Sequence, residues 1–127
     1  MTTSGAAPPR HWRIIQHLVP GLLFAAALAL YAHHLEIPER YVFDEVYYAY
    51  TAGEYVRANP DAYLWNTRAP REGVAYVWNH PPLGVLLIAS GIAIWGDHSS
   101  GWRFPAAICG AAGVMLAYFL ALRFTRS

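Results

Sequence analysis

Two long apolar segments constrain the fold of this chain more than any other feature. Residues 14–32 and 106–122 contain no Asp, Glu, Lys or Arg, and a helix of about 20 apolar residues crosses the core of a bilayer. The whole chain is 56% hydrophobic and 13% charged, whereas about 25% of residues are charged in average soluble domains. A chain of 127 residues is too short to bury so much apolar surface in a soluble core. We therefore predict an all-α integral membrane protein with two transmembrane helices.

A third apolar segment, residues 83–95, is too short to span a bilayer and predicts a helix at the membrane surface. The charge distribution supports two spans rather than three. Arg10 and Arg13 precede the first span and Arg123 and Arg126 follow the last. Two spans place both arginine-bearing ends on the cytoplasmic side, as the positive-inside rule prefers, whereas three spans would export the second pair. We therefore expect a plasma-membrane protein with both termini in the cytoplasm.

These expectations divide the chain into five parts, with the second span beginning at Pro105 because proline suits the first position of a helix. The parts are a disordered cytoplasmic lead (1–13), a first transmembrane helix (14–35), an extracytoplasmic loop (36–104) with juxtamembrane helices at about 44–58 and 81–95, a second transmembrane helix (105–123) and a cytoplasmic tail (124–127). One alternative stays open. The small residues at 27–29, Ala-Leu-Ala, also resemble the cleavage site of a secretory signal, although the apolar stretch is long for one.

Several classes of function find no support in the sequence. The chain contains no lysine, which argues against a basic nucleic-acid-binding surface. Its one cysteine, Cys109, can form no intrachain disulfide. No His-x-x-x-His spacing or comparable ligand cluster is present, and the adjacent pair His33 and His34 marks the end of the first span. We therefore predict no cofactor, and a divalent metal is not indicated.

Asp44 and Glu45 open the first predicted helix of the outer loop. Asp44 is expected at the N-cap, where a short carboxylate accepts backbone N–H bonds, and Glu45 in the first turn, which the helix dipole favours. Taken alone, the pair is a helix cap with an acidic neighbour. The alternative is a carboxylate pair at the outer membrane surface, one member of which removes a proton from an acceptor hydroxyl.

Other polar and aromatic residues of the loop each have two interpretations. Arg57, Arg68 and Arg71 are either solvated charges or contacts for an anionic phosphate, and Arg103 is either a boundary anchor or a contact for a lipid phosphate. The aromatic side chains are either interfacial anchors or platforms for sugar rings. These aromatic residues are Tyr63, Trp65, Tyr76 and Trp78.

Three short motifs follow the first span in a fixed order. They are Phe-Asp-Glu-Val-Tyr-Tyr-Ala at 43–49, His-Pro-Pro-Leu-Gly at 80–84 and Gly-Trp-Arg at 101–103. This order resembles the start of the protein O-mannosyltransferases of the GT-C superfamily, over residues 14–123. The lipid A aminoarabinose transferases are similar in plan but usually have Lys where this chain has His80, which favours the mannosyltransferases.

The resemblance implies a site and a reaction. Asp44 would be the general base on a Ser or Thr hydroxyl, and Glu45 would orient the acceptor or support that base. His80 and Arg103 would hold the carrier phosphate or the loop around it. Mannose or a related sugar would pass, with inversion, from a polyprenyl-phosphate carrier to a secreted or membrane protein. Val85 departs from the family, in which a basic residue often follows the Leu-Gly step.

The family also implies partners, because its members have many more spans than two. The remaining helices of a longer or split enzyme would complete the donor cavity, so we expect the 127-residue chain alone to be inactive. Two alternatives stay open. One is a small non-catalytic membrane protein that assembles through Gly110 and Gly113 of its second span. The other, within the GT-C superfamily, is a glycosyltransferase acting on lipid A or a cell-wall glycan.

Overall fold

The structure, a computed structural model, describes residues 10–125 and forms helices joined by irregular connections, with no strand among these residues. The element order is α1 (Arg10–Ala32), α2 (Glu45–Val56), the 3₁₀ helix η1 (Pro60–Tyr63), α3 (Leu83–Trp95) and α4 (Ser99–Thr125). The all-helical prediction is therefore confirmed for the described part of the chain. Most of the expected lead at 1–13 and part of the tail at 124–127, including Arg126, lie outside it.

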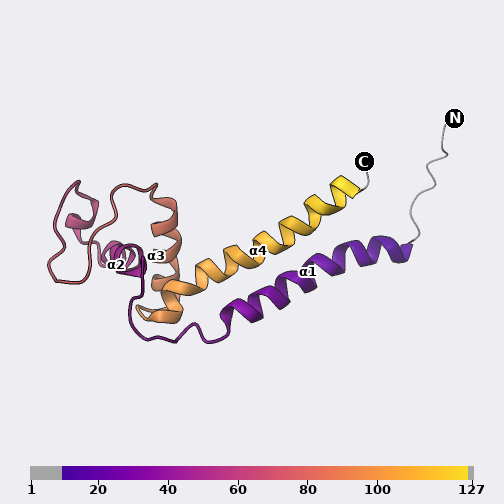
Figure 1. The fold of residues 1–127 in the computed structure, drawn as a ribbon, viewed down its shortest axis with the longest axis horizontal. Coiled ribbons are helices and arrows are strands. Elements are labelled where there is room, and N and C mark those ends of the chain that lie inside the picture. Colours follow the sequence, from indigo (N-terminus) through magenta and orange to yellow (C-terminus); the bar gives the residue numbers. More distant parts are fainter. Residues whose placement is uncertain (1–9, 126–127) are drawn as a thin grey trace.

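Helices α1 and α4 run side by side as an antiparallel pair, so the start of α1 and the end of α4 lie at the same end of the molecule (Figure 1). The pair exposes large apolar side chains, among them Leu22 at 68%, Leu30 at 73% and Leu116 at 58%. Many exposed large apolar side chains on one helix pair favour a membrane or protein contact. Of the described helices, only α4 is long and apolar enough to cross a membrane by length and composition, because the described apolar part of α1 is restricted to Leu18–Ala32.

Glycine lets the two long helices approach closely. A Cβ atom at Gly110 of α4 would lie 3.0 Å from the ring of Tyr31 in α1. The expectation that Gly110 admits a neighbouring helix thus holds within the chain itself. Gly113, one turn further on, has no atom within 4 Å of its Cβ position.

The beginning of α4 differs from the prediction. The helix starts at Ser99, and Pro105 lies inside it rather than at its first position. Proline has no N–H to bond the carbonyl four residues earlier, here that of Gly101. That carbonyl faces α3, where a Cβ on Gly91 would lie only 2.3 Å away. The backbones of α3 and α4 thus come into close contact because Gly91 and Gly101 have no side chains. The sequence alone did not predict this contact.

A small core holds α2 against the corner of α3 and α4. Ala49 and Ala52 of α2 contact Val85 and Ile92 of α3 and Trp102 of α4, and all five are at least nine-tenths buried. Small side chains on α2 allow this close contact. The loop helices are shorter than predicted: α2 covers 45–56 rather than 44–58, and α3 covers 83–95 rather than 81–95, with Pro82 at its N-cap.

Candidate functional site

A tight turn places Asp44 and Glu45 at the start of α2. The Glu45 amide donates to the Val42 carbonyl at 3.0 Å, and the Glu45 carboxylate accepts from the Val42 amide at 3.0 Å. Between them Phe43 takes a φ of 47°, a left-handed conformation that is uncommon for a bulky residue. Such strain concentrates at functional sites. The turn leaves Phe43 93% exposed beside the carboxylates.

Asp44 occupies the predicted N-cap position but makes no side-chain cap hydrogen bond. Its φ of −68° and ψ of −10° are helical, whereas a capping residue usually has an extended backbone that brings its side chain to the free N–H groups. The predicted cap bond is therefore wrong. Among the described residues, the Asp44 carboxylate has no hydrogen-bond or ion-pair partner.

Glu45, in contrast, is bound by Arg103 from α4. The Arg103 Nε donates to Glu45 Oε1 at 2.6 Å, and one terminal nitrogen donates to Oε2 at 2.9 Å. The side chains are only 13% exposed for Arg103 and 23% for Glu45. Burial opposes ionisation of Glu45, but the bonds from Arg103 and the Val42 amide outweigh it and lower its pKa. Glu45 is therefore a carboxylate at neutral pH.

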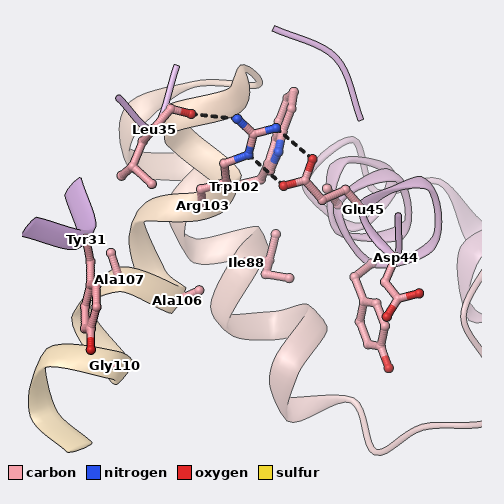
Figure 2. Close-up of a pocket in the computed structure, with 12 residues that line it drawn as sticks. Tyr31, Leu35, Asp44, Glu45, Ile88, Trp102, Arg103, Ala106, Ala107 and Gly110 are labelled. Carbon is pink, nitrogen blue, oxygen red and sulfur yellow. Dashed lines mark hydrogen bonds and ion pairs between the residues drawn. The ribbon is translucent and has the colours of Figure 1, made fainter. Parts of the chain in front are cut away.

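Arg103 also holds the connection between α1 and α2. It donates to the Leu35 carbonyl at 2.8 Å and to the Arg40 carbonyl at 3.2 Å. A guanidinium has five N–H donors, and these two bonds and the two to Glu45 use four of them. Arg103, which belongs to α4, thus links this helix to the segment that follows α1 and to the start of α2 (Figure 2).

A large hollow opens beside this ion pair, and we call it the apolar hollow. Its volume is about 620 Å³. Its floor and walls are mostly apolar, and Asp44, Glu45 and Arg103 contribute its charged groups. Figure 2 shows Glu45 turned toward Arg103, whereas the Asp44 carboxylate points away from it. The lining residues are Tyr31, Leu35, Asp44, Glu45, Tyr48, Ala49, Ile88, Trp102, Arg103, Ala106, Ala107 and Gly110.

A second hollow, the loop hollow, lies on the other side of Asp44. Its volume is about 440 Å³, and Asp44 and Tyr48 line both hollows. The two residues are four positions apart and so share one face of α2. The other residues of the loop hollow are Tyr47, Ala75, Tyr76, Val77, Trp78, Asn79 and His80. Asp44 therefore stands between an apolar hollow and a hollow rich in aromatic and polar groups.

The structure groups the four predicted site residues in two sets. Asp44, Glu45 and Arg103 line the apolar hollow, and Asp44 and His80 line the loop hollow. His80 lies with its ring centroid 5.6 Å from that of Tyr48, and its Nδ1 is 3.0 Å from Asn79 Oδ1. His80 and Arg103 share neither hollow.

Two loop arginines have protein partners. Arg57 bonds Glu54 at 2.7 Å and also pairs with Asp97 in the α3–α4 turn. The guanidinium carbon of Arg71 lies 5.4 Å from the centre of the Tyr50 ring. Among the described residues no three His, Cys, Asp or Glu side chains come close enough to hold a metal ion.

The sequence did not predict the part that two further residues take in the site. Thr51 is fully buried in α2, and its Oγ1 accepts a hydrogen bond from the Val77 amide at 3.0 Å. This bond holds the segment 75–80, which lines the loop hollow. Tyr48 belongs to the motif at 43–49, and its spacing of four residues from Asp44 is the signal that places both on one helix face. For Thr51 no local signal exists, because its partner is distant in sequence.

Comparisons with known proteins find relatives by sequence. The chain is 34% identical over 87 residues, 68% of its length, to a polyprenol-phosphate-mannose–protein mannosyltransferase of Mycobacterium tuberculosis (strain ATCC 25618 / H37Rv). A protein of the same name from Mycolicibacterium smegmatis (strain ATCC 700084 / mc(2)155) is 48% identical over 48 residues, 38% of the chain. An undecaprenyl phosphate-alpha-4-amino-4-deoxy-L-arabinose arabinosyl transferase of Pseudomonas savastanoi pv. phaseolicola (strain 1448A / Race 6) is 36% identical over 105 residues, 82% of the chain.

The chain spans only 15%, 9% and 17% of the length of these three relatives, in the order given. No family model and no solved structure matches it. The helical fold and the names of the relatives support a membrane glycosyltransferase of the type that uses a polyprenyl-phosphate sugar. Within that class, the relatives support the reading of the chain as a fragment of the polyprenol-phosphate-mannose–protein mannosyltransferase family, as the motifs predicted.

Proposed function

We propose that this chain carries the catalytic base of a membrane enzyme that transfers mannose from a polyprenyl-phosphate carrier to a Ser or Thr hydroxyl. One observation carries the proposal: of the adjacent acidic pair, Asp44 is the carboxylate without a partner among the described residues, and it lines both the apolar hollow and the loop hollow. A general base needs a free carboxylate within reach of the proton it removes. Glu45 is committed to Arg103 and so acts by positioning.

The two hollows suit the two substrates. The apolar hollow has the lining that a polyprenyl chain requires, and residues of α1, α2, α3 and α4 line it. The loop hollow has the hydroxyl, amide and imidazole groups that a polypeptide backbone and a hydroxyl side chain require. A hydroxyl bound in the loop hollow would meet the carrier's sugar at Asp44.

The reaction then proceeds as one inverting displacement. The acceptor oxygen attacks the anomeric carbon of the sugar and forms the new glycosidic bond. The bond from that carbon to the phosphate oxygen breaks, and its electron pair stays on the polyprenyl phosphate. The hydroxyl proton passes to the Asp44 carboxylate. Removing a positioned base of this kind slows a reaction by about 10²- to 10⁴-fold.

His80 and Arg103 have different roles in this proposal. Arg103 holds the loop around the carrier phosphate, because four of its donors are used by the protein. Its remaining N–H allows at most one phosphate contact. His80 is exposed and faces the same hollow as Asp44, so it contacts the reacting phosphate or the acceptor.

The proposed arrangement in the membrane has two spans, α1 and α4, with α2 and α3 on the outer face and both termini in the cytoplasm. The antiparallel α1–α4 pair supports this arrangement, since its two free ends lie together (Figure 1). Further helices supplied by a longer or split enzyme would complete the donor cavity.

The test measures mannosyl transfer from polyprenyl-phosphate-mannose to a Ser/Thr peptide. It uses membranes that express this sequence with whatever coding sequence adjoins it. Asp44→Asn should lower the rate at least about 10²-fold with unchanged expression. Asp61→Asn, an exposed acid in η1 outside both hollows, is the matched control and should keep the rate. If Asp44→Asn transfers mannose at the wild-type rate, Asp44 is not the catalytic base.

A second acceptor class has one observation in its favour. The arabinosyl transferase match covers 82% of the chain, more than either mannosyltransferase match. The name of that relative specifies an undecaprenyl-phosphate-linked amino sugar. The same membranes should therefore also be supplied with a lipid A acceptor and that donor, and transfer there without transfer to peptide would favour the second class.

A further inference from the structure

The indole of Trp102 lies beside the ion pair of Glu45 and Arg103 (Figure 2). The guanidinium carbon of Arg103 is 5.9 Å from the centre of the Trp102 ring. Trp102 is only 7% exposed and belongs to the small core between α2, α3 and α4. Its ring also packs against that of Tyr41, with centroids 4.8 Å apart. These contacts fix the indole and therefore the direction of its N–H.

The Trp102 Nε1 is a buried donor without a hydrogen-bond partner among the described residues. An indole N–H can only donate, and burying one without a completed bond costs free energy. Such donors are few in folded proteins, and each calls for a physical reason. The acceptor beside it is Glu45. Burial raises the pKa of this carboxyl, whereas Arg103, the Val42 amide and the Trp102 indole lower it.

The Glu45 carboxylate can accept one more bond. A carboxylate has about four acceptor positions on its two oxygens. Arg103 donates to both oxygens, and the Val42 amide donates to Oε2. These three bonds leave a position for the Trp102 N–H.

An anionic phosphate in the apolar hollow would act against the charge on Glu45. Arg103 lines this hollow and has one N–H that the described residues do not bond. An anion bound there favours the protonated form of a nearby carboxylate. The other titratable side chains of the lining, Asp44, Tyr31 and Tyr48, bring no positive charge, and α3 contributes none that titrates. An indole N–H favours the carboxylate without adding a cation that would compete for the phosphate.

We propose that Trp102 is a positioning residue whose indole N–H keeps Glu45 ionised, and so bound to Arg103, when the carrier phosphate lies beside Arg103. The presence of the carrier rests on the function proposed above. Arg103 satisfies Glu45 in the free protein, and the indole completes its bond as the phosphate draws on the guanidinium. Because Glu45 opens α2 next to Asp44, a charged Glu45 keeps the proposed base in place.

The first measurement follows the indole N–H proton of Trp102 by NMR, with the full chain in lipid nanodiscs, as the pH is lowered. An N–H beside a carboxylate senses its charge, so this resonance should move as Glu45 takes up a proton. The movement should disappear in Glu45→Gln. The indole of Trp95, which packs against Phe104, is the internal control and should not follow Glu45. A Trp102 resonance that is insensitive to Glu45→Gln would overturn the assignment.

The second measurement uses Trp102→Phe, which keeps an aromatic ring but removes the donor. Glu45 should then bind its proton about two- to tenfold more tightly, the value of at most one ordinary hydrogen bond. The side-chain carboxyl ¹³C resonance of Glu45 reports this affinity. A purely structural role would lower stability without changing it, and the control Trp95→Phe should leave it unchanged. Unchanged proton affinity in folded Trp102→Phe would overturn the assignment. If that variant does not fold, the first measurement decides, because it uses Trp102 itself.

The third measurement adds undecaprenyl phosphate to the nanodiscs, with undecaprenol as the uncharged control. The phosphate should move the Trp102 N–H proton downfield and leave Glu45 ionised near neutral pH. In Trp102→Phe it should tighten proton binding by Glu45 further, and the alcohol should do neither. If the phosphate has no effect while the first two results hold, it does not lie beside Arg103, and the carrier part is rejected. The transfer rate of Asp44→Asn concerns only the base.

Discussion

Arg103 holds both carboxylate oxygens of Glu45, from Nε at 2.6 Å and from a terminal nitrogen at 2.9 Å, across 58 positions of sequence. Bidentate pairs of this kind fix direction as well as distance. Because Arg103 also binds carbonyls of the preceding connection, one guanidinium determines where α2 begins and therefore where Asp44 lies. The two neighbouring carboxylates therefore differ in their contacts. Glu45 is bound by Arg103, whereas the Asp44 carboxylate has no partner among the described residues.

Loss of this guanidinium should destabilise the packing of α2 against α4. Arg103→Gln leaves Glu45 largely buried without a cation and removes a donor from the Leu35 carbonyl, and we expect a cost of about 2–3 kcal/mol. Thermal unfolding in detergent micelles measures it. Arg123→Gln, in the last turn of the same helix, should stay within about 0.5 kcal/mol of the wild type. Equal melting of both variants would mean that the pair does not hold α2.

Acid should weaken the same contact. The folded pKa of Glu45 is lowered from the ordinary 4.5, so its stabilisation is fully present above that value and is lost as the pH falls through the lower folded pKa. The stability difference between wild type and Glu45→Gln should therefore be constant from pH 7 to about pH 5 and shrink below 4.5. Urea unfolding at several pH values measures it, and a difference that persists unchanged to about pH 2 contradicts the assignment.

Thr51 should control the wall of the loop hollow. Thr51→Val keeps the side-chain shape but leaves the Val77 amide without its acceptor, at a cost of about 1–3 kcal/mol. Hydrogen exchange at Val77 should become faster. Thr51→Ser keeps the oxygen and should retain slow exchange, and Thr125→Val, which loses only bonds to carbonyls of its own helix, should not affect it. Slow exchange at Val77 in Thr51→Val would exclude this bond as the constraint.

The α3–α4 corner should tolerate no side chain at its glycines. A Cβ at Gly101 would lie 2.0 Å from the Gly96 carbonyl, and one at Gly91 would lie 2.4 Å from Pro105. Alanine at either position should cost about 1–3 kcal/mol through overpacking. Gly113→Ala has open space and should stabilise α4 by up to about 1 kcal/mol. Melting temperatures of the three variants test this difference. An unchanged melting temperature for Gly101→Ala would mean that α3 and α4 move apart easily at the corner.

Cysteine labelling should report two spans. In a Cys109→Ser background, Asn66→Cys in the outer loop should react with an impermeant maleimide on intact cells, and Thr125→Cys should react only after permeabilisation. If α3 also crossed the membrane, the end of α4 would move to the outer face. Labelling of both positions from outside would then replace the two-span arrangement with three.

The sequence alone predicted those features that depend on composition or on residues close together in the chain. Apolar length predicted the long helices, the shortness of residues 83–95 predicted a separate helix there, and three spaced motifs indicated the family before any contact was known. The prediction that α4 begins at Pro105 failed because helix initiation there depends on Gly91 and Gly101, which give two backbones room to touch. The cap bond at Asp44 failed because the turn at Phe43 sets a helical backbone at the cap position.

By itself, then, the sequence determined an apolar helical chain with an acidic pair ahead of His80 and Arg103. Tertiary structure alone decided which carboxylate of the pair is free. Arg103 lies 58 positions from Glu45, and whether it binds Glu45, Asp44 or a lipid phosphate depends on how the α3–α4 corner meets α2. Coulombic attraction favours any of these partners, and only the packing of Trp102 against Ala49 and Ala52 brings Glu45 within reach.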